Sequence, residues 1–141
     1  MLEGLVSPVV ITRDTAGVPT IRGASRLDVA RGLGYLHAQE RFFQMDLTRR
    51  RAAGELAELL GKTVLRYDLE SRRHDFRLLA EALYPQLPTD QQSIISTYTE
   101  GVNAGLLALK KNPFEYMLLR TDPAPWKNED VLLMIYAMAL D

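Results

Sequence analysis

The fold is decided by residues 25–51, which read SRLDVARGLGYLHAQERFFQMDLTRRR. Ser25 is followed three residues later by Asp28, which is the spacing of a capping box at a helix N-terminus. This spacing predicts a helix that runs from Ser25 to about Arg51. The apolar residues occupy two sides of the helix rather than one stripe, which is typical of a helix buried nearly all round.

The preceding residues, 1–24, are expected to form an extended segment with a β-hairpin. β-Branched residues dominate 8–13, residues 14–17 have the composition of a turn, and 18–21 can return as a second strand. Pro19 has no N–H group, so it is expected at an edge or at the start of a strand. An isolated hairpin is marginally stable in water, so we expect this one to join a sheet supplied by other residues.

Helices are expected through most of residues 25–141. Gly61 fits the left-handed position after a short helix at about 55–60, which Gly54 separates from the first helix. Further helices are expected at about 68–83, at about 90–110 after a capping box of Thr89 and Gln92, at 114–119, and from near Asn128. The predicted fold class is mainly α with a short N-terminal β-hairpin, with residues 1–141 forming a single segment.

Composition excludes several kinds of site. The 141 residues carry a net charge of -1 and contain no cysteine, so disulfides, thiolate metal ligands and a cysteine nucleophile are excluded within them. The arginines at 49–51 have acidic neighbours such as Asp46 and Glu55, which favours a solvated or internally paired face over a nucleic-acid interface. His37 and His74 do not form a metal-binding pattern, and no serine lies in a nucleophile elbow.

The last expected helix is apolar on every face. Its residues 131–140 are all apolar or aromatic, and the sequence stops at Asp141 without a helix-closing glycine or basic residue. The run is shorter than the ~20 residues that a bilayer span needs, so burial against protein is expected rather than a membrane. We therefore expect a chain truncated within this helix, a protein partner that covers it, and self-association of the chain without that partner.

Polar residues on the first helix are candidates for a structural network, namely His37, Gln39, Glu40, Arg41 and Gln44. His37 and Arg41 are four residues apart, as are Glu40 and Gln44, so each pair is expected on one helical face. Burying such groups without partners costs on the order of 1–3 kcal/mol each. A hydrogen-bonded network that fixes the helix is therefore favoured over direct catalysis by His37. Gly32 and Gly34 lie inside the helix, where close helix packing is favoured over phosphate binding.

Several separated blocks of the sequence, in the same order along almost the whole chain, resemble the penicillin acylase family. The longest are 32–35 (GLGY) and 37–46 (HAQERFFQMD). The others are 10–14, 17–19, 49–50, 54–58 with Gly61, Asp68 with 72–73, Tyr98 with 101–104, 113–115, 125–126 and 129–130. The sequence departs from the family at Thr20, where many relatives have histidine, and at Lys127, where a helix-capping threonine is usual. Ordered blocks are more specific than a single motif.

The resemblance implies an N-terminal nucleophile hydrolase of layered α-β-β-α fold, made as a precursor that cuts itself into a smaller α chain and a larger β chain. Residues 1–141 would be an α-chain fragment. The nucleophile, usually serine, would be the first residue of the β chain, with its own α-amino group as base. No catalytic residue, metal or cofactor is therefore expected in this chain, which should be inactive alone. Some relatives bind calcium through a residue beyond the position of Asp141, so calcium is an expectation for the full enzyme only.

The resemblance also gives the last helix a role, because in the family it reaches an acyl-binding pocket lined by both chains. Met138, Ala139 and Asp141 are the candidate pocket residues, with core packing as the alternative for the first two. The implied reaction is hydrolysis of a small acyl amide, such as a β-lactam side chain or an acyl-homoserine lactone. The implied location is periplasmic or secreted, with the cytoplasm left open. The competing interpretation is a self-contained helical interaction module that docks through its last helix.

Overall fold

The computed structural model describes residues 5–139, which form one β-hairpin followed by helices. The chain divides into two compact units. The first unit contains the residues up to Glu40 and residues 89–110, and the second contains residues 41–88 and those from Lys111 onward. The mainly helical fold with a short hairpin is as predicted.

The hairpin of the first unit consists of strands β1 (Val10–Arg13) and β2 (Pro19–Arg22), paired antiparallel with Ile11 opposite Ile21. Its turn is closed by the Asp14 carboxylate, which accepts hydrogen bonds from the N–H groups of Ala16 and Val18, both at 2.9 Å. Gly17 has φ 80°, a left-handed conformation that glycine adopts without strain. The predicted turn is confirmed, and Pro19 is the first residue of β2, as expected.

The start of helix α1 (Arg26–Ala53) is tied to the residues before the hairpin. The Ser25 hydroxyl oxygen accepts the Asp28 N–H at 3.0 Å, which is one half of the predicted capping box. The Asp28 carboxylate, however, accepts the N–H groups of Val6 at 2.8 Å and Ser7 at 3.2 Å, and the Ser25 hydroxyl donates to it at 2.8 Å. The hydrogen bond from Ser25, helped by the two backbone bonds and opposed by burial, holds the pKa of Asp28 below its usual value.

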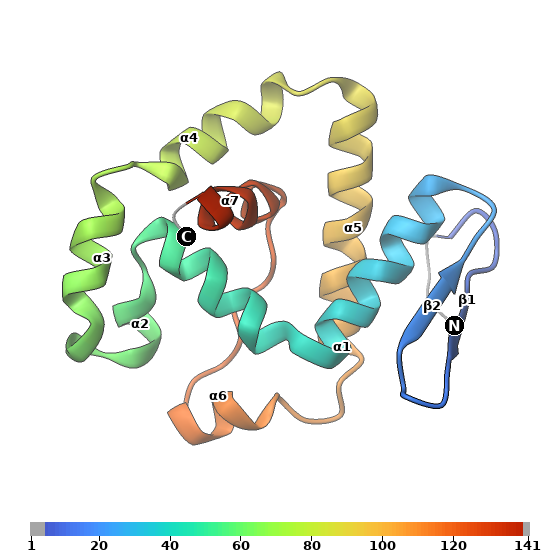
Figure 1. Ribbon diagram of the computed structural model, residues 1–141, viewed down its shortest axis with the longest axis horizontal. Helices are drawn as coiled ribbons and strands as arrows, with labels where there is room; N and C mark the ends of the chain where they lie inside the picture. Colours follow the sequence, from blue (N-terminus) through green and yellow to red (C-terminus); the bar gives the residue numbers. More distant parts are fainter. Residues whose placement is uncertain (1–4, 140–141) are drawn as a thin grey trace. The chain divides into compact units, whose positions relative to one another are not determined.

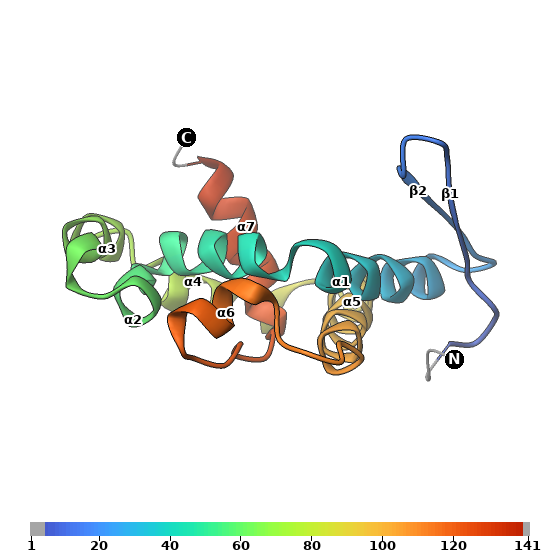
Figure 2. The same ribbon diagram turned by 90° about the horizontal axis from the view of Figure 1, so that it is seen from below.

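Helix α5 (Thr89–Leu107) crosses the N-terminal part of α1 (Figures 1 and 2). Glycines lie where the two helices meet. A Cβ atom on Gly34 would lie 2.2 Å from the carbonyl oxygen of Tyr98, and one on Gly101 would lie 2.1 Å from that of Arg31. Both distances are far below van der Waals contact, so only glycine permits this approach. The expected close helix packing is confirmed for Gly34. At Gly32 the neighbour is instead the Val9 side chain, which lies 3.0 Å from where a Cβ atom of residue 32 would be.

Helix α1 is less regular and less buried than predicted. Arg41 has φ -150° and ψ 30°, which are not helical values, so the prediction of an uninterrupted helix is wrong at this residue. No proline or glycine lies next to Arg41 to signal the kink. Leu27 and Leu33 are 38% and 36% exposed, so burial on every side is not achieved within the described chain.

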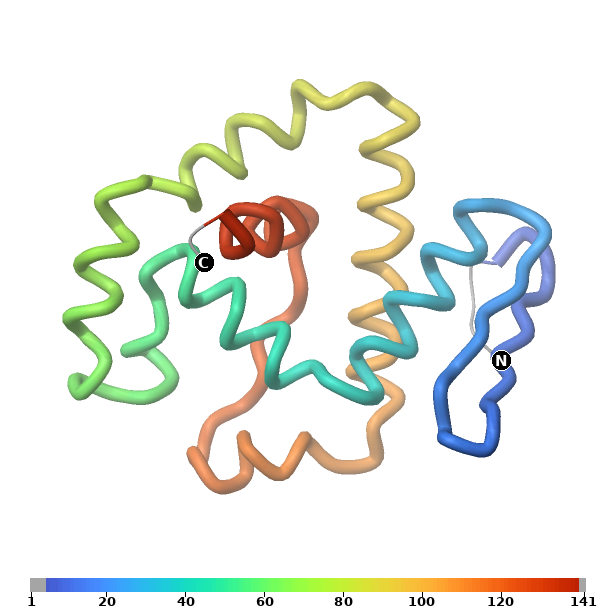
Figure 3. Tube along the Cα trace, viewed as in Figure 1, coloured from blue at the N-terminus to red at the C-terminus, as the bar shows by residue number. Residues whose placement is uncertain are grey.

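The second unit contains two short helices where the sequence predicted one at 68–83. They are α3 (Leu65–Arg72) and α4 (Phe76–Leu83), and the trace turns between them (Figure 3). Asp75 has φ 51°, a left-handed conformation that aspartate tolerates better than most residues and that ends the helical path. After this turn, α4 packs on the last helix of the chain.

A short helix, α2 (Leu56–Leu60), precedes α3, and a 3₁₀ turn, η1 (Lys62–Val64), joins the two. Asp68 of α3 accepts the first N–H groups of α2, those of Leu56 at 2.8 Å and Ala57 at 2.7 Å, and so caps that helix from a distance. Gly61 follows α2 with φ 77° and ψ -173°. Its positive φ agrees with the prediction, but its ψ is extended rather than that of the left-handed helix region.

The core of the second unit lies where helix α7 (Asn128–Ala139) meets α4 and the last turn of α1 (Figure 1). Small residues allow this approach. The buried members of the core are Ala52, Ala53, Ala80, Leu132, Leu133 and Ala137, and the partly buried Phe76, Tyr84, Leu87 and Tyr136 pack against them; Tyr84 belongs to the 3₁₀ turn η2 (Tyr84–Gln86). Helix α6 (Phe114–Leu119) completes the unit. Within residues 5–139, no helix combines the length and apolar character needed to cross a membrane.

Candidate functional site

Helix α7 carries the predicted pocket residues and has two different faces. Leu133 and Ala137 are buried in the core, whereas Ile135 is 57% exposed and Met138 is 73% exposed. Ala139 is also exposed, and Asp141 lies outside the described residues. Within the described residues, the expected burial of α7 against protein is found on one face only. One face packs on α4 and α1, and the other is open.

The start of α7 is fixed by the buried carboxylate of Asp130, which is 1% exposed. This carboxylate accepts hydrogen bonds from the backbone N–H of Lys127 at 2.8 Å, from Arg49 at 2.5 Å and from Arg77 at 2.7 Å. The bond to the Lys127 N–H is one half of a capping box. The other half, a side-chain oxygen at position 127 that accepts the Asp130 N–H, is what the usual threonine would supply and what lysine lacks. A charged residue in a low-dielectric interior thus has three donors around it.

Arg49 connects α7 to α1 and to the connector before α7. Its guanidinium is 5% exposed and donates to Asp46 at 2.8 Å and to the carbonyl oxygens of Ala124 and Pro125, both at 2.9 Å, in addition to Asp130. It also lies over the buried Trp126 ring, 4.8 Å from its centroid. The planar fork of arginine suits this combination of carboxylates, carbonyls and an aromatic face.

Two further ion pairs extend the network. Arg77 donates to both oxygens of Glu55, at 3.0 and 2.6 Å. Burial alone would lower the pKa of Arg77, but its hydrogen bonds to Glu55 and Asp130 outweigh burial and raise the pKa above its usual value. Arg50 donates to Asp46 at 2.9 Å. The internal pairing predicted for this arginine cluster is therefore confirmed for Arg49 and Arg50.

Three of the five polar residues predicted to form a network lie in the first unit, each with a separate partner. His37 Nδ1 is 3.0 Å from the Tyr98 hydroxyl, and the Gln39 amide donates to the Gly105 carbonyl oxygen at 2.6 Å. Glu40 forms an ion pair with Arg13 of β1. Burial raises the pKa of Tyr98 to about 12, so its hydroxyl keeps its proton at neutral pH. These contacts fasten α1 to α5 and to the hairpin.

Arg41 and Gln44, the other two residues, are exposed and lie in the second unit. The prediction that Arg41 lies on one helical face with His37 assumed regular helical geometry, whereas the backbone of Arg41 is non-helical.

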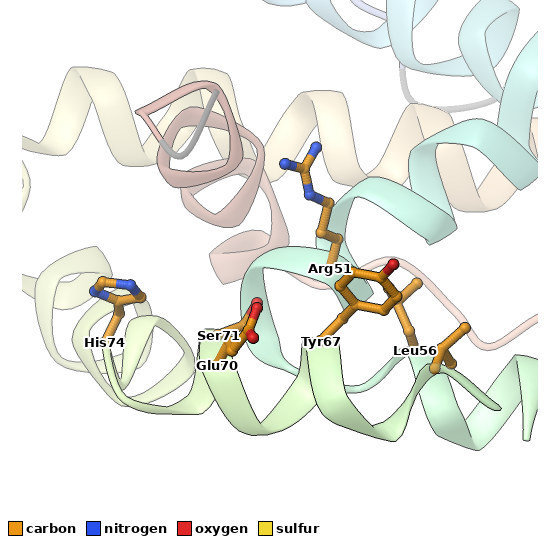
Figure 4. A pocket seen from close by; sticks show the side chains of 7 residues that line it. Arg51, Leu56, Tyr67, Glu70, Ser71 and His74 are labelled. Atoms are coloured by element: carbon orange, nitrogen blue, oxygen red, sulfur yellow. The ribbon is translucent and has the colours of Figure 1, made fainter. Parts of the chain in front are cut away.

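A groove of about 470 Å³ lies along α3, outside the predicted site (Figure 4). Leu56 and Tyr67 line one part of it, and Glu70, Ser71 and His74 line another, with Arg51 projecting from α1. The His74 ring stacks on Phe76, with centroids 5.0 Å apart and planes 13° apart. This stacking gives His74 a packing role and does not make it the base of a serine nucleophile. Among the described residues no group of acidic, histidine or cysteine side chains could hold a metal ion.

These features define a helical chain whose buried charges are structural and whose last helix presents an apolar face. The sequence model for penicillin amidase matches residues 8–141, and the chain belongs to this family.

The relatives show how much of such a protein this chain represents. It is 38% identical over 126 residues to penicillin acylase 2 proenzyme of a Pseudomonas species, 31% identical over 139 residues to penicillin G acylase of Escherichia coli, and 34% identical over 134 residues to the acyl-homoserine lactone acylase QuiP of Pseudomonas aeruginosa. These matches cover 89%, 95% and 94% of this chain, but each spans only 16% of the relative.

A solved structure agrees with this assignment. The thermostable penicillin G acylase from Alcaligenes faecalis superposes with a TM-score of 0.85 at 30% identity, over 96% of this chain and 74% of that chain.

Sequence reasoning missed the ion network beneath α7. Asp130 belongs to a family block, but nothing in the sequence pairs it with Arg77 or Arg49, which are 53 and 81 residues away. Only the spacing of Lys127 and Asp130 at the start of a helix could have indicated the cap.

Proposed function

We propose that these residues are the α-chain part of a self-processing acylase that hydrolyses acyl amides. The observation that carries the proposal is the family match over residues 8–141 in a chain that spans 16% of its curated relatives, one of which is named a proenzyme. Most of such a protein, including its reaction centre, would therefore lie outside these residues. The structural roles of the buried carboxylates and arginines of this chain support the same division.

In the proposed reaction, the first residue of the β chain attacks the amide carbonyl, with its own α-amino group as base. The amine leaves with a proton, and water then hydrolyses the acyl-enzyme. The acyl group would belong to a β-lactam side chain or to an acyl-homoserine lactone, the two substrate types named among the relatives. The α chain alone would be inactive, because it supplies neither the nucleophile nor the oxyanion hole.

The contribution of this chain would be to line and support the acyl pocket through α7. Met138, Ala139 and Asp141 would line the acyl pocket, and the rest of the open face, with Ile135, would contact the β chain. The ion network of Asp130 would hold the helix in place from the opposite side. The β-hairpin would add its strands to the sheet of the β chain. Calcium, if the enzyme binds it, would be held by residues beyond this chain, and the mature protein would be periplasmic or secreted.

The test is to express the untruncated gene and to determine the mass and N-terminal sequence of every resulting polypeptide. Two chains, the larger beginning with serine, threonine or cysteine, are expected. The two-chain protein and the isolated 141 residues would then be compared, at equal concentration, for release of acid from a penicillin and from an acyl-homoserine lactone. A single unprocessed chain would refute self-processing, and turnover by the isolated 141 residues would refute the assignment of the nucleophile to the β chain.

A further inference from the structure

Helix α6 is unusually well held for an element of six residues, which is too short to be stable by itself. Its Tyr116 is completely buried, and the hydroxyl donates to Asp46 at 2.6 Å. The Tyr116 ring packs edge-on against Phe43, with centroids 5.4 Å apart, and near Phe42 at 6.2 Å. One anchoring side chain therefore fixes α6 to the second unit.

Both ends of α6 are also closed by backbone hydrogen bonds. Before the helix, the Pro113 carbonyl oxygen accepts the Tyr116 N–H at 3.0 Å. After it, Arg120 adopts the left-handed conformation with φ 55°, and the N–H of Thr121 donates to the Tyr116 carbonyl oxygen at 3.1 Å. This arrangement is typical of a helix C-cap. Helix α6 is thus ordered before any partner binds.

The outward face of α6 is apolar. Phe114, Met117 and Leu118 are 68%, 55% and 79% exposed, and their spacing of three and four residues places them on one face of the helix. Half of the residues of α6 are therefore large apolar side chains in contact with solvent. Such a patch on a pre-ordered support is typical of the centre of an interface.

We propose that the α6 face, defined as Phe114, Met117 and Leu118, is a docking surface for the remaining part of the longer polypeptide. The inference rests on the proposed function, and the occupant is chosen because the chain spans only 16% of its curated relatives. Interfaces within such permanent assemblies are more apolar than transient ones. This surface lies on a different helix from the predicted pocket residues of α7, so it is a second contact between the two parts.

The experiment uses the full-length protein with a single cysteine introduced by Leu118→Cys or, as a second variant, by Met117→Cys. The described chain has no cysteine of its own, and mass spectrometry of the peptide that contains the variant residue separates its labelling from that of any cysteine elsewhere. A maleimide labels each protein in the native state and in urea. Ala16→Cys, in the exposed hairpin turn, calibrates the reagent.

Labelling at both α6 positions is expected to be at least about tenfold slower in the native protein than in urea. A native rate within about twofold of the rate in urea would show that the face is open and would overturn the proposal. If the protein has the mass of a dimer, and both the dimer and the protection of the cysteines are lost on dilution, the face binds a second copy of the protein. That result would also overturn the proposal. The masses of the polypeptides in the same sample show independently whether the precursor was cut into two chains. Protection in an unprocessed chain would support the docking surface while refuting the proposed maturation.

Discussion

Replacing Asp130 by asparagine removes one negative charge beneath α7 while it preserves the size of the side chain. Asp130 is 1% exposed and accepts bonds from Arg49, which is 5% exposed, and from Arg77, which is 23% exposed. A hydrogen bond to a charged group contributes about 1.5–3 kcal/mol. The hydrogen bond from the buried Arg49 is expected to contribute this full amount, whereas solvent screening reduces the contribution of the bond from Arg77. Because the amide oxygen can still accept one bond, we expect a loss of about 3 kcal/mol in the local stability of α7.

The measurement is hydrogen–deuterium exchange of the peptide 127–139 in the full-length protein. A loss of about 3 kcal/mol corresponds to exchange that is about 150-fold faster. The matched control is Glu129→Gln, which removes a charge from the next residue. Glu129 pairs with Lys127 only at 3.8 Å, and the Lys127 side chain is 64% exposed, so a change below about 0.5 kcal/mol is expected. Equal effects of the two variants would refute the argument that the buried ion network holds α7.

Three other predictions concern the fold. Gly34→Ala is expected to destabilise the protein by about 3 kcal/mol or more in urea unfolding, because its Cβ would meet a carbonyl oxygen at 2.2 Å. The control Gly17→Ala, with no atom within 4 Å of the added Cβ but a φ of 80°, should cost only about 1 kcal/mol. Equal costs would contradict the claim that close packing requires Gly34. Tyr116→Phe removes the hydrogen bond to Asp46 and should speed exchange across α6 in proportion to a loss of about 2 kcal/mol, whereas unchanged exchange would show that ring packing alone holds this helix. Folding lowers the pKa of Asp28, so the stability that its carboxylate contributes should be fully present above ~pH 5 and lost as the pH falls through the folded pKa. The difference in urea unfolding midpoint between wild type and Asp28→Asn should therefore shrink below ~pH 4. A difference that grows on acidification would contradict the lowered pKa.

Local signals in the sequence determined most of the elements but not their interruptions. The turn at 14–17 follows from the side-chain chemistry of Asp14 and the positive φ of Gly17, both of which act within a few residues. The breaks at Arg41 and Asp75 were missed because neither residue is a glycine or a proline. Apolar periodicity continues across Arg41, and residues 70–75 are all polar, which is also compatible with a solvent-exposed stretch of helix.

The sequence by itself also determined the family, because many short blocks in a fixed order identify a relative without any knowledge of contacts. Tertiary structure alone decided which charges are structural. Asp130 meets Arg77 and Arg49 across 53 and 81 residues, and Tyr116 meets Asp46 across 70. Those pairs form only when helices distant in sequence pack together. Which apolar residues stay exposed, such as Met138 on α7 and Leu118 on α6, was decided in the same way, since periodicity shows that a helix has an apolar face but not which neighbour covers it.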